Sequence, residues 1–271
     1  MISVVIITKN EENNIIDCIA SARLITNDII VVDSESTDQT VALAVQEGAT
    51  VFAMDWNGYG TAKNSGANRA KHNWIFSLDA DERITPQLAC SIKKLKLNDT
   101  DCIYQFTRTN YIGNKKIKFG TGGFDKVTRL YNKQNVNWDL TAVHEKLVGA
   151  NTKEKIKGRL IHYSAKSLQD YKEKIIFYAK LSAEKYFEQR LHAGFTKRFV
   201  APLFNSFKSY FLQFGFLDGR TGFGLARLIA YYTWLKYRQL HQLEQKKTEN
   251  KRVSLRWQKS TSNTAISFSR K

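Results

Sequence analysis

The sequence is poor in cysteine and has no long apolar run. Three cysteines, Cys18, Cys90 and Cys102, occur in 271 residues, and no two of them form a C-x-x-C pair. The odd number and the spacing argue against a disulfide framework and a zinc site, and they fit a reducing compartment. No stretch approaches 18 uncharged apolar residues, which argues against a membrane-spanning helix. The N-terminus reaches Lys9 too soon for a signal peptide and has no basic region before it.

Two phosphate-binding motifs are also missing. No G-x-G-x-x-G follows the first apolar run and no G-x-x-x-x-G-K-[ST] occurs anywhere, which argues against a dinucleotide fold and a P-loop. We find no internal repeat. What the sequence does contain is 42% hydrophobic and 12% aromatic residues, as in a folded protein. The length suits one large domain or two modest ones.

Positive charge is concentrated in the second half of the chain, and the formal net charge is +17. Residues 1–145 hold 16 Lys and Arg against 17 Asp and Glu, whereas residues 146–271 hold 26 against 8. This asymmetry indicates a polyanionic partner, which could be nucleic acid, anionic lipid or a phosphorylated substrate. We therefore expect the two halves to have different roles.

Strand and helix patterns alternate over the first 80 residues. The runs that favour buried strands are 3–8, 29–33, 49–56 and 75–79. Helical spacing follows at 15–24, at 36–47 with Gly48 as the stop, and at 63–70. This alternation predicts an α/β fold, with a mostly parallel sheet flanked by helices on both faces.

Polar residues stand where three of these strands end. Thr8, Asp33 and Asp79 each terminate an apolar run, so all three are expected at one carboxyl edge, where open α/β sheets bind ligands. A buried Asp33 carboxylate could accept hydrogen bonds from ribose hydroxyls or a base N–H. The alternative for Asp33 is the N-cap of the following helix.

The last of these strands ends in closely spaced carboxylates. Asp79 and Asp81 lie two residues apart, so in extended chain their side chains project to the same side. Two like charges this close need a cation between them, or one must be protonated. Mg²⁺ is held by one or two carboxylates and leaves coordination positions for phosphate oxygens. The alternative is a surface turn with solvated acids.

Three segments in order resemble the inverting family 2 glycosyltransferases with a GT-A (Rossmann-like) fold, and the resemblance runs from Ser3 to about Glu145. They are its first nucleotide loop (8–12), its second, acidic loop (33–38) and its D-x-D metal motif (79–81). The resemblance implies a nucleotide-sugar donor, a UDP-sugar first of all, and Mg²⁺ or Mn²⁺ held by Asp79 and Asp81. The residues that it implies for the donor are Thr8, Asn10, Glu11, Asp33, Lys63 and Asp79. Lys63 would approach the phosphates, and the alternative is a solvated lysine.

A second stretch, Ala142-Val143-His144-Glu145, resembles the lipopolysaccharide-core branch of that family. Inverting transfer needs a group that takes the proton of the acceptor hydroxyl. The resemblance implies Glu145 as this base, and His144 as a residue that orients it or reaches the metal or the phosphates. The sequence departs from the family here, because many members carry an Asp-Asp or Glu-Asp pair at this place. The alternative to a catalytic role is that His144 and Glu145 are ordinary residues at the end of a strand.

Two further residues have similar counterparts in the family. Arg129 lies in a segment that resembles an R-L motif and would hold a phosphate or an acid, or else form a surface ion pair. His162 fits an H-Y segment of the same branch, although a single histidine in an apolar stretch is more often a core residue.

The chain changes character after about residue 166. Residues 199–217 and 225–237 are aromatic-rich helical patterns flanked by Lys and Arg, typical of an interfacial helix pair on an anionic membrane. The alternative is that these helices pack on the catalytic domain. We expect a catalytic domain at 1–165 (nucleotide-sugar half 1–100, acceptor half 101–165), a helical membrane-interface region at 166–244 and a basic disordered tail at 245–271.

These observations favour a metal-dependent hexosyltransferase that acts on a lipopolysaccharide-core or other lipid-linked acceptor. We expect a cytoplasmic protein, peripheral on the inner membrane, with no nucleic-acid partner. One alternative is a basic nucleic-acid-binding protein, although no such motif is present. Another is a nucleotidyltransferase, which would need a glycine-rich phosphate loop, and Thr8–Asn14 contains no glycine.

Overall fold

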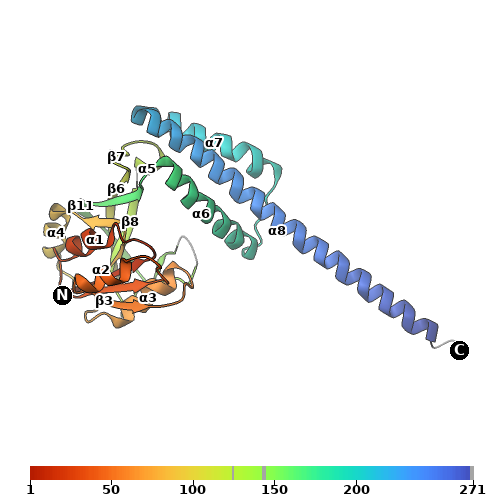
Figure 1. Cartoon of the computed structure of the whole chain (residues 1–271), viewed down its shortest axis with the longest axis horizontal. Helices are drawn as coiled ribbons and strands as arrows, with labels where there is room; N and C mark the ends of the chain where they lie inside the picture. The colour runs from red at the N-terminus through yellow and green to blue at the C-terminus, as the bar shows by residue number, and fades with distance from the viewer. Residues whose placement is uncertain (124, 142–144, 269–271) are drawn as a thin grey trace. The chain divides into compact units, whose positions relative to one another are not determined.

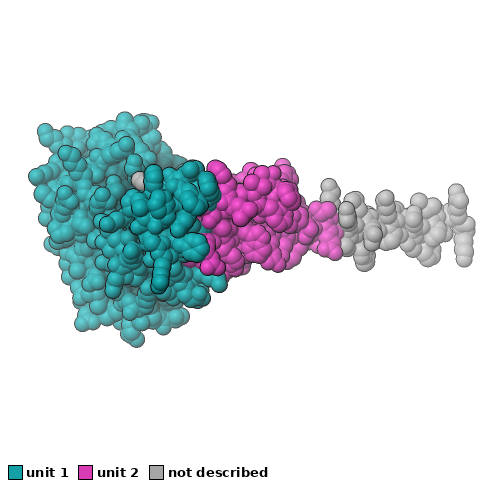
Figure 2. All heavy atoms as spheres, turned by 90° about the horizontal axis from the view of Figure 1, so that it is seen from above, with its two compact units in different colours: residues 1–173, 207–226 teal, residues 174–206, 227–271 magenta. Residues whose placement is uncertain are grey.

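The structure is a computed structural model that describes residues 1–123, 125–141 and 145–268, with side chains to residue 250 (Figure 1). The chain forms two compact units (Figure 2). The first comprises residues 1–173 and 207–226, and the second comprises 174–206 and the chain from 227 onward. No helix in the described part of the chain combines the length and apolarity needed to cross a membrane.

The first half of the main sheet is parallel, as predicted. Its strands are β1 (Ile2–Thr8), β2 (Ile29–Asp33), β3 (Thr50–Ala53) and β4 (Trp74–Asp79). They lie in the order β3-β2-β1-β4, with every neighbouring pair parallel. β-Branched residues dominate β1 and β2, which suits strands buried on both faces.

The second half of the sheet is mixed. Its strands are β5 (Glu82–Ile84), β6 (Cys102–Ile112), β7 (Lys115–Lys116), β8 (Asp125–Asn132) and β11 (Thr152–Ala165). β8 runs antiparallel between β4 and β6, and β11 is parallel to β6 and antiparallel to β5. A small hairpin, β9 (Asn137–Trp138) with β10 (Leu147–Val148), forms a separate sheet. The uniformly parallel pairing that the sequence predicts is therefore found in the order β3-β2-β1-β4, whereas the second half combines one parallel pair, β6 with β11, with antiparallel pairs.

Helices cover both faces of the sheet and complete two cores. α1 (Ile15–Ala22), α2 (Thr40–Gln46) and α4 (Pro86–Lys93) pack on the face that carries Val4 and Ile6. α3 (Tyr59–Arg69) packs on the opposite face, against Val5 and Ile7. The two-residue alternation of a strand divides the apolar run of β1 between the cores.

Two helix starts differ from the prediction. α2 begins at Thr40, because the Asp38 carboxylate accepts the Thr40 N–H at 3.0 Å and stops the helix from extending back to Ser36. α3 begins at Tyr59, four residues before Lys63. The predicted stop at Gly48 is confirmed, since Gly48 has a φ of +70°.

The C-terminal part is helical, as predicted, but is divided differently. Its elements are α6 (Leu168–Glu188), η1 (Thr196–Val200), α7 (Ala201–Phe207), η2 (Lys208–Leu212), η3 (Gly215–Asp218) and α8 (Gly219–Phe268). The short helix α5 (Gly120–Gly123) lies earlier in the chain, between β7 and β8. Residues 207–226 belong to the first unit, not to a separate helical region. The predicted disordered tail is a continuation of α8 as far as Phe268. No glycine or proline occurs between Gly224 and Phe268 to end the helix.

Candidate active site

The three predicted strand ends meet at one edge of the sheet. Thr8 is in register with Asp33 of β2, and its neighbour Ile7 is in register with Asp79 of β4. Parallel strands bring their carboxyl ends to the same edge, so one edge collects a hydroxyl and two carboxylates from segments far apart in sequence. The placement predicted for these residues is therefore confirmed, whereas their roles stay predictions.

Two oxygens at this edge are buried without a hydrogen bond. Within the described residues, neither Oγ1 of Thr8 nor Oδ1 of Asp33 has a partner. The other carboxylate oxygen of Asp33 accepts the Ser36 N–H at 2.9 Å, so Asp33 also fixes the turn after β2. Buried polar atoms are normally hydrogen-bonded. An unpaired hydroxyl and an unpaired carboxylate oxygen side by side are available for a polar ligand.

The first loop is joined to the second by hydrogen bonds. Asn10 donates its N–H to Ser36 Oγ at 2.8 Å, and its Oδ1 accepts the Thr37 N–H at 2.8 Å. Glu11 donates its N–H to Thr40 Oγ1 at 2.8 Å. Asn10 adopts a left-handed conformation with φ of +55°, which asparagine tolerates better than most residues. The sequence predicts that Asn10 and Glu11 bind the donor. In the structure they fix the first loop to residues 36–40 at this edge of the sheet.

Asp79 is held by two cations. Arg129 Nη2 lies 2.5 Å from Oδ2 of Asp79, and Lys63 Nζ lies 3.5 Å from Oδ1. Burial by itself raises the pKa of the Asp79 carboxyl, but the charges of Arg129 and Lys63 outweigh it and keep that pKa below its ordinary value. Asp79 therefore stays ionised and fixed in place.

Of the two alternatives that the sequence left for Arg129, the structure fits contact with an acid and not a surface ion pair. Its side chain is buried and its Nη2 also donates to Glu82 Oε1 at 2.6 Å. Although burial opposes the charge, Asp79 and Glu82 raise the pKa of the Arg129 guanidinium above its ordinary value. Arg129 thus joins two carboxylates inside the protein and is not part of a surface ion pair.

Glu82 connects this pair to a second group of polar residues. Its fully buried carboxylate accepts from Arg108 Nη1 at 2.9 Å. Arg108 Nε donates to Asp125 Oδ2 at 2.7 Å, and the same oxygen accepts from Asn110 Nδ2 at 3.1 Å. Sequence reasoning assigned no role to these four residues. Only Glu82 gave a signal, as the third acid of the Asp79–Glu82 stretch, because the others meet only through the pairing of β6 with β8.

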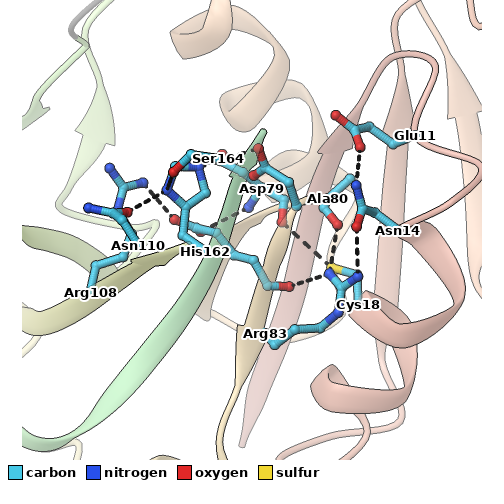
Figure 3. A network of polar contacts seen from close by, with 12 residues as sticks. Glu11, Asn14, Cys18, Asp79, Ala80, Arg83, Arg108, Asn110, His162 and Ser164 are labelled. Carbon is cyan, nitrogen blue, oxygen red and sulfur yellow. Dashed lines mark hydrogen bonds and ion pairs between the residues drawn. The ribbon is translucent and has the colours of Figure 1, made fainter. Parts of the chain in front are cut away.

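The turn that carries the two aspartates is clamped by Arg83 (Figure 3). Arg83 Nη1 donates to the carbonyl oxygens of Ala80 and Glu82, each at 2.9 Å. Its Nη2 donates to Asn14 Oδ1 at 3.2 Å, next to the first loop. Cys18 Sγ contacts the Asp79 carbonyl oxygen at 3.6 Å. This turn is therefore a rigid part of the fold, and the alternative of a solvated surface turn does not apply.

Asp81 faces His162, the histidine of the H-Y segment, for which the sequence offered a core position as the alternative. His162 Nε2 lies 3.3 Å from Asp81 Oδ2, and both side chains are largely buried. Its other ring nitrogen, Nδ1, lies 2.6 Å from Asn110 Oδ1 and 3.0 Å from Ser164 Oγ (Figure 3). A carboxylate from the turn between β4 and β5 and an imidazole from β11 thus lie side by side, whereas the sequence predicts Asp79 as the partner of Asp81 in the metal motif.

The hydrogen bonds of Asn110 determine the tautomer of His162. The Asn110 amide donates to the carbonyl oxygen of Gly122 at 2.7 Å and to Asp125, so its remaining atom, Oδ1, must accept from Nδ1–H of the imidazole. In the neutral ring Nε2 then carries a lone pair directed at the Asp81 carboxylate. Two electron donors 3.3 Å apart require a cation between them, either a metal ion or a proton.

Lys63 and Glu145 form the second ion pair of the site. Lys63 Nζ lies 2.5 Å from Glu145 Oε1 and 4.5 Å from the centre of the Trp138 ring. The Lys63 side chain is only 2% exposed, so the alternative of a solvated lysine is wrong. Its nearest anions are the carboxylates of Glu145 and Asp79. The sequence predicts instead that Lys63 approaches the phosphates of the donor. His144 lies outside the described residues.

Close packing brings α3 up to the segment that carries the base candidate. Asn64 donates Nδ2–H to the Trp138 carbonyl at 2.8 Å and accepts the Trp138 N–H at 3.0 Å. A Cβ on Gly60 would lie 1.9 Å from the Asp139 carbonyl oxygen and 3.6 Å from the Cβ of Glu145. Only glycine at position 60 permits this approach, which puts Lys63 within reach of Glu145.

A divalent cation fits the Asp81–His162 pair better than the predicted Asp79–Asp81 pair. Among the described residues no three His, Cys, Asp or Glu side chains form a complete metal site. Mg²⁺ and Mn²⁺ do not need one, because substrate phosphates and water fill the remaining positions. Both carboxylate oxygens of Asp79 face cations, Arg129 and Lys63, whereas Oδ2 of Asp81 and Nε2 of His162 lie 3.3 Å apart and offer an oxygen and a nitrogen ligand.

Comparison with known proteins gives a family and several relatives. The model of "Glycosyl transferase family 2" matches residues 3–151. A protein of Rickettsia felis described as an uncharacterized glycosyltransferase is 30% identical over 276 residues, which cover 97% of each chain. The lipopolysaccharide core biosynthesis glycosyltransferase LpsC of Rhizobium meliloti is 28% identical, over 87% of this chain and 88% of LpsC.

Among solved structures, the mannosyltransferase PcManGT of Pyrobaculum calidifontis, in complex with GDP-Man and Mn²⁺, matches with a TM-score of 0.48. The sequences are 15% identical, and the match covers 69% of this chain and 63% of PcManGT.

Proposed function

The chain belongs to glycosyltransferase family 2, and from this we propose that it transfers a hexosyl group from a UDP-sugar to an acceptor hydroxyl with inversion. In this reaction the bond between the anomeric carbon and the diphosphate oxygen breaks, and a bond from the acceptor oxygen to that carbon forms on the opposite side. The acceptor proton goes to a base, and UDP leaves.

The observation that carries the proposal is the juxtaposition of Asp81 Oδ2 with Nε2 of His162, 3.3 Å apart, at the ligand-binding edge of the sheet. This pair suits Mg²⁺ or Mn²⁺. When bound, the metal would supply positive charge to offset the charge that develops on the departing diphosphate. Asp79 would act beside it as a fixed acceptor for donor hydroxyls.

The nucleotide would lie against the two unpaired oxygens, Thr8 Oγ1 and Asp33 Oδ1. A carboxylate there can accept hydrogen bonds from ribose hydroxyls or a base N–H, and the hydroxyl can donate to an oxygen. Asn10 and Glu11 would support this subsite through the loop that they fix to residues 36–40.

Glu145 would take the proton of the acceptor hydroxyl. Its contact with Lys63 supports this role, because the ion pair holds the carboxylate in one orientation before the acceptor arrives. In place of the predicted contact with phosphates, Lys63 is thus a positioning residue for the base. His144 would complete this part of the site as the sequence suggests.

A lipopolysaccharide-core or other lipid-linked glycan is the acceptor that the relatives favour, since LpsC is named for core biosynthesis. The basic charge of residues 146–271 fits such an anionic acceptor and an anionic membrane surface. We therefore propose that the protein works at the cytoplasmic face of the inner membrane as a peripheral enzyme.

A donor screen tests the proposal. We expect UDP release from one UDP-sugar in the presence of Mn²⁺ or Mg²⁺, lost on addition of EDTA and reduced at least a hundredfold in Asp81→Asn and in His162→Ala. Glu154→Gln, a change at an exposed residue of β11, is the control and should keep wild-type turnover. Turnover that survives EDTA and both site variants would contradict the proposed metal site.

A further inference from the structure

Exposed apolar side chains are concentrated in one short part of the chain. Of the 22 large hydrophobic residues exposed in the described structure, 12 lie between Phe195 and Phe223. Seven of these belong to the first unit: Phe207, Phe211, Leu212, Phe214, Phe216, Leu217 and Phe223. We call residues 207–223 the aromatic platform. Contiguous exposed apolar surface of this kind is rare on monomeric soluble proteins and marks an interaction site.

The platform has a defined internal structure that keeps its phenylalanines outside. Tyr210 forms its centre, with edge-to-face ring contacts to Phe211, Phe216 and Phe223 at centroid distances of 5.0, 6.2 and 5.8 Å. A Cβ on Gly222 would lie 1.9 Å from the carbonyl oxygen of Gly215, so two turns of backbone touch there. The aromatic side chains are exposed because the backbone is packed against itself beneath them.

Buried polar groups attach the platform to the acceptor-side half of the catalytic unit. The buried Asp218 carboxylate accepts the N–H groups of Lys118 and Phe119 at 3.0 and 2.9 Å. Ser209 Oγ, also buried, accepts the Thr121 N–H at 3.2 Å. Charge-assisted bonds from one carboxylate to two backbone amides are among the stronger anchors available to a loop. The platform is therefore a fixed part of the first unit.

The charges around the platform are positive. The cations of residues 207–223 and of the attached segment 113–123 are Lys115, Lys116, Lys118, Lys208 and Arg220. Asp218, the one acid in these two segments, is buried and bonded to backbone amides. A surface that is both aromatic and positively charged is complementary to an anionic lipid bilayer, which offers an apolar interior beneath negative headgroups.

We propose that the aromatic platform, with the lysines of residues 115–118, is a docking surface for an anionic phospholipid bilayer. The phenylalanines enter the headgroup region while the lysines and Arg220 contact lipid phosphates. This surface shares residues 207–217 with the helix pair that the sequence favoured, 199–217 with 225–237, but it lies in the first unit and does not need α8 beyond residue 226.

The anchoring segment also leads into the catalytic site. The Gly122 carbonyl oxygen accepts from Asn110 Nδ2 at 2.7 Å, and Asn110 in turn fixes His162, which faces Asp81. Docking would therefore set the orientation of the metal pair relative to the bilayer. This consequence for a lipid-linked acceptor rests on the proposed function, whereas lipid binding itself does not.

Vesicle co-sedimentation of the full chain tests the proposal. We expect binding to vesicles of phosphatidylcholine with 30–40% phosphatidylglycerol, in roughly the range that anionic membranes provide, and at least tenfold weaker binding to phosphatidylcholine alone. The triple variant Phe211→Ser, Phe214→Ser, Leu217→Ser should lose at least tenfold in partition coefficient. Ile16→Ser with Val45→Ser, at exposed apolar sites elsewhere in the first unit, is the matched control and should bind normally.

A charge variant keeps the test valid if the apolar variant fails to fold. Each basic group near an anionic surface contributes about a fivefold factor in binding. Lys115→Gln, Lys118→Gln, Lys208→Gln should therefore lower the partition coefficient by about a hundredfold. The control replaces three exposed lysines at the end of α4: Lys93→Gln, Lys94→Gln, Lys96→Gln.

Three results would overturn the proposal. They are wild-type protein that stays in solution with anionic vesicles, platform variants that bind as the controls do, and a wild-type dimer that the phenylalanine variant makes monomeric in sedimentation velocity. The last result would assign the platform to a second copy of the chain. Hydrolysis of the UDP-sugar in solution is measured in parallel, so that failure of the enzyme activity with intact lipid binding rejects the proposed function alone.

Discussion

The ammonium nitrogen of Lys63 lies 2.5 Å from a carboxylate oxygen of Glu145 and 3.5 Å from one of Asp79. Helix α3 thus delivers one buried cation between the base candidate and the sheet edge. Since Lys63 is 2% exposed and lies over the Trp138 ring, few other positions are open to its charge. The arrangement joins the acceptor-side and donor-side carboxylates through a single side chain.

Removal of this cation should abolish transfer and destabilise the fold. In Lys63→Met the Glu145 carboxylate loses its partner in a largely buried position, and breaking a buried pair costs about 3–5 kcal/mol. We expect turnover to fall at least a hundredfold, with a much smaller change in affinity for UDP, because Lys63 has no contact with Thr8 or Asp33 in the described structure. Lys71→Met, at an exposed lysine, is the control. Equal losses in UDP affinity and turnover would instead assign Lys63 to the phosphates.

Glu145→Gln should separate donor binding from transfer. The glutamine keeps the shape and a hydrogen-bonding oxygen but cannot accept the acceptor proton, and general base catalysis contributes about 10²–10⁴-fold. We expect transfer to fall by that factor, while calorimetry finds unchanged affinity for UDP with Mn²⁺. Normal transfer by Glu145→Gln would remove Glu145 from the mechanism and turn attention to His144.

Asn110→Leu should weaken metal binding without touching the metal. The leucine removes the acceptor that holds Nδ1–H of His162, so the ring is free to rotate or change tautomer. Loss of such an outer hydrogen bond typically costs about 10–100-fold in metal affinity. The signal of free Mn²⁺ in electron paramagnetic resonance measures this without any turnover. Asn114→Leu, at an exposed position in the turn after β6, should bind Mn²⁺ as the wild type does; equal binding by the Asn110 variant would contradict the tautomer argument.

Asp125 should make stability depend on pH in the acid range. Burial alone raises the pKa of the Asp125 carboxyl, but Arg108 and Asn110 outweigh it and hold that pKa below its ordinary value. A carboxyl with a lowered pKa in the folded state stabilises the protein above its unfolded pKa of about 3.9, and that contribution disappears as the pH falls through the folded pKa. Asp125→Asn should thus be less stable than wild type at pH 7.

The difference between the two proteins should narrow as the pH falls below about 4. Urea unfolding followed by tryptophan fluorescence from pH 7 to pH 3 measures it. A difference that stays constant over this range would mean that Asp125 contributes by packing and not by charge.

Local patterns predicted the donor side of the site well. Thr8, Asp33 and Asp79 could be placed together because each ends an apolar run, and parallel strands align their ends. The alternation of strand and helix patterns correctly predicted helices on both faces of the sheet. It also placed Asp79 and Asp81 correctly in the fold, although the structure favours His162 as the partner of Asp81.

Contacts between distant residues could not be predicted in the same way. Lys63 and Glu145 are 82 residues apart, and Asp79 and Arg129 are 50 apart. Their meeting depends on the order of the strands and on one glycine, Gly60, and no periodicity encodes either of them. That residues 207–226 belong to the first unit could not be predicted for a similar reason, since the amides that Asp218 binds lie about 100 positions earlier in the chain.

The paired hydrogen bonds between Asn64 and the Trp138 main chain have a mechanical consequence. They tie α3 to β9, so a shift of the helix would be passed directly to this strand. A bound sugar that displaces the helix would then move β9 as well, and Glu145, the base candidate, would keep its contact with Lys63. The distance from the base to the sheet edge, rather than the protonation of the base, would then be the quantity that substrate binding adjusts.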